Sequence, residues 1–411
     1  MLLDSLLTDM AVGWRNLGRN RKRTALTWGA IALAQAALVW MTAFMNGYQA
    51  DIFDTLTGPM LGHVQVHAPK YLDDNLVERV LPRADALEKA IAGLPRVASV
   101  SPRVYGPVLA AQKQMGHVAM VAGLDLALED RPGGLLAGLP ARELPGRGEA
   151  LVGRELARSM GLKPGDTLAL MGQAADGSIA SGLYRVKGLV ETAVEPLNRN
   201  GILMGLAQAQ DLLAMPDEVH EIVVKADSPA DIPGVAAAMR GLKALSGDDV
   251  RTWDQLAPQI ASILKVMGHF NLVIMVLVFI TTVAGVANTM LMATYERGHE
   301  FGMLLSLGCR PGRLSRMLLM EALVLGLAGV ATGTALGLAF TWHQRLDMSA
   351  FFGGKDSFAF NGMNMSLVIP YIPRARDVLM GVGAVMATSA LACLWPARRI
   401  SRMEPSEALR S

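Results

Sequence analysis

Residues whose types and spacing could support chemistry gather in one short segment, residues 288–308, NTMLMATYERGHEFGMLLSLG. Within it Glu296, Arg297 and Glu300 recur at helical spacing, and side chains three or four residues apart share one face of a helix. They can therefore make charged contacts with a partner. A second set offers an apolar ridge suited to a partner's groove, namely Phe301, Leu304 and Leu305. The pattern indicates a docking surface rather than a catalytic centre.

Enzymatic and metal patterns are weak elsewhere in the chain. The sequence has no G-x-x-x-x-G-K-[ST] loop for phosphate, and we expect no cofactor here; if ATP drives this protein, another subunit binds it with Mg²⁺. His63 and His67 fall on a strand-like stretch without a supporting carboxylate or Cys pattern, and we interpret them as solvated strand histidines. Nucleic-acid binding is not indicated, because the outer domain has no basic, aromatic patch.

The elements that position the charged segment are membrane helices. The chain has 411 residues, of which 52% are hydrophobic and 18% charged, which is too apolar for an ordinary soluble protein and too charged for a wholly embedded one. Four apolar segments approach the roughly 20 residues that a helix needs to cross the hydrocarbon core. They are residues 25–47, 266–294, 317–343 and 377–396.

Basic residues give these segments an orientation. Lys and Arg crowd the flanks before the first segment, between the second and third, and after the fourth, and basic flanks stay in the cytoplasm. We therefore expect a multi-pass protein of the bacterial inner membrane with both termini in the cytoplasm. The cytoplasmic parts are residues 1–24, 295–316 and 397–411, and the periplasmic parts are residues 48–265 and 344–376.

The large periplasmic segment predicts an α+β domain. GHVQVHAP at residues 62–69 alternates like a half-buried strand, and a helical pattern at residues 84–94 and further strand patterns follow it. From about residue 125 to 215 the pattern is richer in strands and turns. We therefore predict an α/β sandwich module that is interrupted by a β-rich module.

Small and polar residues inside the apolar segments suggest how the helices pack. Gly329, Gly333 and Gly337 recur every four residues and form a small-residue face for close helix approach. Polar groups within the membrane are Gln35, Asn288 and Glu321. Near the cytoplasmic surface, Glu321 can reach lipid headgroups or Arg316, which favours an interfacial or coupling role over proton transport.

Several of these residues carry a resemblance to a known family. The segment resembles the elbow of FtsX-like ABC transporter permeases, with the matching positions Asn288, Met290, Glu296, Arg297, Glu300, Gly302, Leu307 and Gly308. WRNLGRNRKRTALT resembles the family's amphipathic helix before the first span, and PARRISRMEPSEALRS resembles its C-terminal end. The number and order of the spans agree as well. Within the family, GHVQVHAPKY and the lack of a fused ATPase are most similar to permeases of the lipoprotein-releasing type.

The resemblance implies a mechanotransmission (type VII) mechanism without a central channel. Two permease chains, whether identical or paralogous, would work with a cytoplasmic ABC ATPase dimer, and residues 295–316 would contain the coupling helix. Closure of the ATPases would push the elbow and move the periplasmic domains as levers. The positions expected to couple to the ATPase are Glu296, Arg297, Glu300, Phe301, Gly302, Leu304, Leu307 and Gly308.

Three functions remain open for such a lever. It could extract lipoprotein or lipid from the outer leaflet of the inner membrane and pass it to a periplasmic carrier. It could drive efflux of peptides or small molecules through a periplasmic adaptor. It could instead regulate a periplasmic cell-wall hydrolase. Membrane lipids are partners in each case.

Overall fold

The structure, a computed structural model, describes residues 21–113, 115–129, 134–136, 144–192, 194–342, 344–353, 357–360, 363–392 and 398. The described residues divide into a helical unit (those before residue 50, residues 263–348 and those from 368 onward) and an extramembrane unit (residues 50–262 and 349–367). The predicted N-terminal amphipathic helix, up to residue 20, lies outside the described residues. So do residues 393–396 of the fourth segment and the cytoplasmic tail apart from Arg398.

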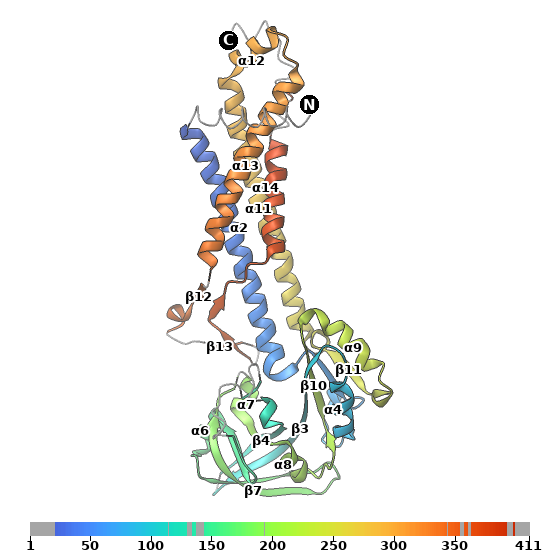
Figure 1. Ribbon diagram of the computed structural model, residues 1–411. Coiled ribbons are helices and arrows are strands. Elements are labelled where there is room, and N and C mark those ends of the chain that lie inside the picture. Colours follow the sequence, from blue (N-terminus) through green and yellow to red (C-terminus); the bar gives the residue numbers. More distant parts are fainter. Residues whose placement is uncertain are drawn as a thin grey trace. The chain divides into compact units, whose positions relative to one another are not determined.

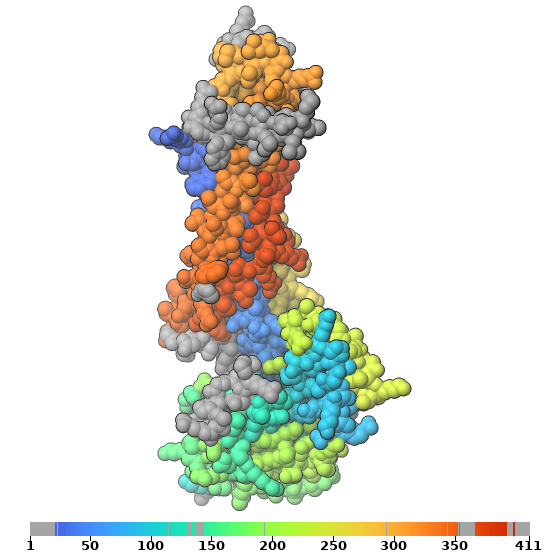
Figure 2. Space-filling model, viewed as in Figure 1, coloured from blue at the N-terminus to red at the C-terminus, as the bar shows by residue number. Residues whose placement is uncertain are grey.

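In the helical unit, the described chain contains four helices that are long and apolar enough to cross a membrane, and Figure 1 shows them running alongside one another. They are α2 (Arg21–Leu56), α11 (Pro258–Glu296), α13 (Pro311–Thr341) and α14 (Ala375–Ala392). Each predicted apolar segment falls on one of them, and the surfaces of α13 (orange) and α14 (red) meet in Figure 2. With 36 and 39 residues, α2 and α11 are longer than the roughly 20 residues a span needs.

The predicted loop between the third and fourth segments contains short strands that partly pack on α2. β12 (Arg345–Asp347) pairs with β15 (Val368–Pro370), and β13 (Ser357–Phe360) pairs with β14 (Met363–Ser366). Just after β15, the Ile372 N–H donates to the Ala43 carbonyl over 2.9 Å, and Trp40 Nε1 donates to the Tyr371 hydroxyl over 3.0 Å. These two hydrogen bonds join the segment after β15 to α2.

In the extramembrane unit, nine of the described strands form one sheet in the order β11-β1-β10-β3-β4-β8-β5-β7-β6. Their bounds are β1 (Val64–His67), β3 (Val97–Gln112), β4 (Met115–Leu124), β5 (Glu149–Gly153), β6 (Thr167–Gln173), β7 (Ile179–Val190), β8 (Gly201–Gly205), β10 (Glu221–Ala226) and β11 (Asp249–Thr252). A separate short pairing joins β2 (Leu81–Pro82) to β9 (Glu218–Val219).

Helices lie along this sheet. They are α3 (Tyr71–Asp74), α4 (Ala84–Ala92), α5 (Leu126–Glu129), α6 (Arg154–Met160), α7 (Glu195–Asn200), α8 (Leu206–Leu212), α9 (Ile232–Arg240) and α10 (Trp253–Leu256). Figure 1 shows α4 and α9 beside β10 and β11, and α6, α7 and α8 around the remaining strands.

Strand β3 organises the sheet because it changes neighbours along its length. Residues 97–103 pair with β10, residues 103–112 pair with β4, and residues 108–111 also pair with β6. Among the described strands, the last pairing closes a ring of six, β3-β4-β8-β5-β7-β6. The expected β-rich module is therefore not independent of the α+β part: the two share β3 and β4, and one buried apolar cluster includes residues of both.

The prediction for β1 and its histidines is wrong in its exposure. All four residues of β1, which lies between β10 and β11, are buried rather than alternating, so both faces of this strand are covered. His67 is fully buried and stacks on Tyr71, which in turn stacks on His220. Just before the strand, half-buried His63 accepts a hydrogen bond at Nδ1 from the Ala226 N–H over 2.9 Å. These histidines therefore belong to the core and its edge, not to a solvated face.

Acid should weaken the extramembrane unit through these histidines. Burial, with the nearby charge of Lys225, lowers the pKa of His63 to about 4, and burial also lowers the pKa of His220. The unfolded chain takes up protons near pH 6.5 while the folded chain does not, so stability is full above about pH 6.5 and falls as pH drops toward 4. We expect the urea midpoint of the extramembrane unit, followed by hydrogen–deuterium exchange of its strands in the full chain, to fall between pH 7.5 and pH 5.

His63→Asn should reduce that fall, because an amide oxygen can accept the same backbone hydrogen bond without titrating. His117→Asn, on β4, serves as the matched control. An equal loss of stability in wild type and His63→Asn would contradict the assignment.

Candidate functional site

The predicted docking segment forms a short helix between two long ones. α11 ends at Glu296, α12 spans Gly298–Ser306, and α13 begins at Pro311. A glycine cap ends α12: Gly308 has φ +86°, its N–H donates to the Leu305 carbonyl, and the Cys309 N–H donates to the Leu304 carbonyl over 2.9 Å. This is the Schellman arrangement, which a residue with a side chain would strain. Gly308 thus serves the turn between the two helices.

Arg297 ties α12 to α13. Its guanidinium lies 3.0 Å from Glu321 and 3.2 Å from Glu300, and it stands 5.2 Å from the ring centre of Phe301. Glu321 is buried, with 7% of its side chain exposed. It therefore pairs with Arg297 rather than with headgroups or Arg316 as we had expected. A buried carboxylate needs such a partner, because losing one member of a buried pair costs about 3–5 kcal/mol.

The exposed apolar residues of α12 are not the same set that the sequence predicts as an apolar ridge. Phe301 is only 2% exposed and packs against Leu314 and Leu318 of α13, so it braces α12 from inside. Gly302 is also buried, and Leu305 packs beside Phe301. The exposed apolar side chains of α12 and its end are Met303, Leu304 and Leu307. Sequence reasoning missed Met303, although it stands four residues before Leu307 and so shares its face.

The charged residues of residues 288–308 also differ in exposure. Glu296 is exposed at the end of α11, and Glu300 is half-buried beside Arg297. The predicted docking residues thus fall into two groups. Arg297, Phe301 and Gly302 lie on the inner side of α12, and Glu296, Leu304 and Leu307 are accessible.

The small-residue face of α13 lies against α2. A methyl group at Gly329 would meet Ile31 at 2.6 Å, and one at Gly337 would meet Val39 at 2.8 Å. At Gly333 it would collide with the Ala32 carbonyl. Glycine at these positions lets the two backbones approach closely, which is how membrane helices gain packing contacts.

The remaining polar groups within the membrane helices have different surroundings. Gln35 is fully buried on α2 and donates from Nε2 to Thr334 on α13 over 3.2 Å, whereas Asn288 is exposed on α11. Nearby, Thr27 of α2 donates to Thr289 of α11 over 3.0 Å. Gln35 and Thr27 therefore add polar contacts to the packing of α2.

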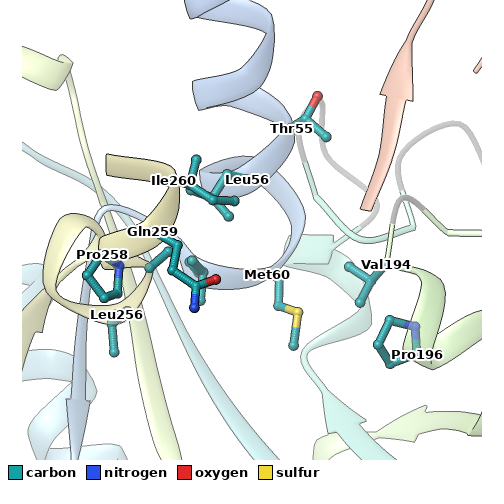
Figure 3. Close-up of a pocket in the computed structure, with 11 residues that line it drawn as sticks. Thr55, Leu56, Met60, Val194, Pro196, Leu256, Pro258, Gln259 and Ile260 are labelled. Carbon is teal, nitrogen blue, oxygen red and sulfur yellow. The ribbon is translucent and has the colours of Figure 1, made fainter. Parts of the chain in front are cut away.

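An apolar cavity of about 370 Å³ lies in the extramembrane unit where α2 ends and α11 begins. Figure 3 shows Met60 between Gln259 on one side and Val194 and Pro196 on the other. Its lining residues are Thr55, Leu56, Met60, Leu61, Val194, Pro196, Leu256, Ala257, Pro258, Gln259 and Ile260. Sequence analysis did not predict it. Only Gly58-Pro59 and Pro258, which mark a helix end and a helix start, hint at it.

This combination defines a class of protein. Four helices long and apolar enough to cross a membrane, a capped short helix between the second and third, and a domain built on one large sheet describe a multi-span membrane protein with a large extramembrane domain. Comparison with protein families agrees: the FtsX-like permease C-terminal family matches residues 272–405, and the MacB-like periplasmic core domain matches residues 24–242. The chain therefore belongs to the FtsX-like permeases with a MacB-like periplasmic core domain, and it is an ABC transporter permease of the LolC/LolE and MacB type.

Individual relatives are distant, and the two Lol proteins match over nearly their whole length. The lipoprotein-releasing system transmembrane protein LolC of Neisseria meningitidis serogroup B is 24% identical over 94% of this chain and 94% of its own. LolE of Haemophilus influenzae is 23% identical over 93% of this chain and 92% of its own. The macrolide export ATP-binding/permease protein MacB of Psychrobacter arcticus is 22% identical over 99% of this chain and 60% of its own. The solved periplasmic region of MacB from Actinobacillus actinomycetemcomitans is 11% identical over 51% of this chain and 97% of its own, with a TM-score of 0.36.

The Arg297–Glu321 pair can be tested by a double-mutant cycle. Arg297→Gln and Glu321→Gln should each lower the free energy of unfolding, because each leaves a buried charge without its main partner. The double variant should lose less than the sum of the two, with a coupling energy of about 0.5–3 kcal/mol. The measurement is chemical unfolding of the full chain in mixed micelles.

Glu296→Gln combined with Glu321→Gln is the matched control, and those two effects should add. Additive losses for Arg297→Gln and Glu321→Gln would show that the pair does not brace α12.

Proposed function

We propose that this chain couples ATP hydrolysis by a separate ATPase dimer to movement of its periplasmic domain, and thereby extracts lipoprotein or lipid from the outer leaflet of the inner membrane. The observation that carries the proposal is α12: it exposes Met303, Leu304 and Leu307 outward and is held to α13 from inside. A rigid short helix with an apolar outer face is suited to receive a push from a partner's groove.

Orientation follows from charge. Basic residues flank the turn between α12 and α13, at Arg310, Arg313 and Arg316, and also precede α2. Such flanks remain in the cytoplasm. With this orientation α12 faces the cytoplasm, both termini are cytoplasmic, and the extramembrane unit is periplasmic. The ATPase would bring ATP and Mg²⁺, and a second permease, either identical or paralogous, would complete the transporter.

The push has a physical route through the helical unit. The Arg297–Glu321 pair and the packing of Phe301 on Leu314 and Leu318 make α12 move together with α13. The glycine face of α13 is in close contact with α2, so α13 cannot shift far without shifting α2. Movement at the cytoplasmic surface would therefore reach the helix that leads into the periplasmic domain.

One apolar space fits an acyl substrate from the outer leaflet, namely the 370 Å³ cavity at the end of α2. A second space, of about 360 Å³, lies in the helical unit between α2 and α11, next to Thr27 and Thr289. In the proposed orientation it lies near the cytoplasmic ends of these helices, so it is not on the path of an outer-leaflet lipid. The similarity to LolC and LolE over nearly the whole chain favours lipoprotein as the source of the acyl chains. A periplasmic carrier would then receive the lipid.

Efflux is the second candidate. The MacB-like match to the periplasmic core domain and the MacB relative favour it. In that case the periplasmic domain would move a substrate toward an adaptor rather than lift an acyl chain from the membrane.

Docking predicts a loss of ATPase binding when the outer face of α12 is made polar. Leu307→Asp should reduce the ATPase subunit recovered with the full-length permease about tenfold or more, and ATP turnover should fall with it. Glu296→Lys with Glu300→Lys should act in the same direction, because it reverses the charge beside that face. Both are measured by co-purification and phosphate release.

Leu183→Asp is the matched control, since Leu183 is about as exposed as Leu307 but lies on β7. Unchanged ATPase recovery with Leu307→Asp would rule out docking through this face.

Crosslinking can identify the class of substrate that enters the cavity at the end of α2. A photoreactive benzoyl-phenylalanine at Met60, in cells fed radiolabelled palmitate, should capture acylated protein or lipid from the cavity. The same group at Met120, exposed on β4, should not. Capture of a non-acylated periplasmic protein at Met60 would favour efflux, and no crosslink at Met60 would contradict extraction through this cavity.

A further inference from the structure

Arg103 on β3 is a charged side chain in the core of the extramembrane unit, with 2% of its side chain exposed. Its guanidinium donates to Glu129 Oε1 from Nη2 over 2.6 Å and from Nε over 3.1 Å. Glu129 is itself 3% exposed and also accepts from Ser101 and from the Leu135 N–H. A buried pair of this kind is fixed in position, because neither charge has access to water.

The same guanidinium holds the end of the first membrane helix. After α2 the chain makes one π-helical turn, Thr57–Leu61, before Gly62 at φ +60°. Arg103 Nη1 donates to the Met60 carbonyl over 2.8 Å, and Nη2 donates to the Pro59 carbonyl over 3.1 Å. A cation suits these carbonyls, because the last carbonyls of a helix lack partners within it and carry partial negative charge.

Arg103 also occupies a special position in the sheet. It is the last residue of β3 paired with β10, opposite Glu221, and the first paired with β4, opposite Leu124. A displacement of Arg103 would therefore act on β3 at the residue where its pairing changes from β10 to the six-stranded ring.

Met60 connects Arg103 to the apolar cavity. Its carbonyl accepts a hydrogen bond from Arg103, and its side chain lines the cavity.

We infer that Arg103 is a positioning residue that transmits movement of the turn after α2 to β3, and through β3 to the six-stranded ring. The inference rests on the proposed function, since it names the joint through which the lever is moved. The contact is directional, because two hydrogen bonds to consecutive carbonyls and two to one oxygen of Glu129 fix the guanidinium in one plane. Apolar packing alone would not fix the position of the turn Thr57–Leu61 relative to β3.

The groups around Arg103 keep it charged. Burial alone would lower its pKa, but the neighbouring Tyr105, Glu129 and Glu221 outweigh burial and raise it. Glu221 lies 3.8 Å from Arg103 and accepts a hydrogen bond from the Tyr105 hydroxyl over 2.9 Å. The guanidinium therefore keeps its charge although it is buried.

The test is hydrogen–deuterium exchange of the full-length permease with its ATPase in lipid nanodiscs, with and without ATP and vanadate. In wild type, nucleotide should change exchange in residues 57–62 and in residues 97–124. In Arg103→Met, exchange of residues 57–62 without nucleotide should rise about tenfold or more. The nucleotide-dependent change in residues 97–124 should disappear, while ATPase recovery and basal turnover stay within about twofold of wild type.

Controls separate the joint from general stability. Arg96→Met removes an exposed ion pair with Asp231 in the same unit and should behave as wild type. Glu129→Gln leaves both carbonyl contacts of Arg103 in place, so its change in hydrogen exchange should be intermediate between wild type and Arg103→Met. If Arg103→Met does not fold, Glu129→Gln takes its place in the test. A preserved nucleotide response in residues 97–124 of Arg103→Met, or of Glu129→Gln in its place, would overturn the inference.

Failure of the proposed function would look different. In that case wild type itself would bind no ATPase or show no response to nucleotide. The joint would then be judged on nucleotide-free exchange alone, where unchanged exchange of residues 57–62 in Arg103→Met would overturn it.

Discussion

A guanidinium that is largely removed from water needs carboxylate or carbonyl oxygens in fixed places around it, and each unit of this protein contains an arginine under that constraint. In the helical unit, Arg297 meets Glu321 and so fixes α12 to α13. In the extramembrane unit, Arg103 meets Glu129 and the carbonyls that follow α2. Because an unpaired buried charge is so unfavourable, each arginine holds its neighbours in one arrangement. A rigid joint of this kind can carry a displacement, whereas a solvated side chain would absorb it.

The helices between these joints are connected by close backbone contact. Glycines at 329, 333 and 337 leave no side chain between α13 and α2, so the two helices meet through main-chain and small-residue surfaces. Interfaces packed in this way deform little and pass on movement. α2 then continues in the chain directly into the turn that Arg103 holds. In the proposed function, this covalent continuity and the helix packing would carry force from α12 to the turn after α2.

Much of this architecture could be predicted from the sequence because it depends on local patterns. Helix length and hydropathy located the four membrane segments, and the recurring glycines identified the face of α13 that approaches another helix. Partners that lie far apart in sequence could not be predicted. Glu321 was expected near Arg316, but the fold places it against Arg297, 24 positions away. Phe301 was expected on the docking ridge, but α13 covers it.

The sequence by itself therefore determined which segments cross the membrane, which short segment joins them, and which family the chain resembles, since each of these follows from composition, period and motif. Tertiary structure alone decided which face of α12 is exposed, that β3 joins the two parts of the sheet in one core, and that Arg103 holds the turn after α2. The reason is physical. Burial and pairing are properties of two segments brought together, and neither segment contains them alone.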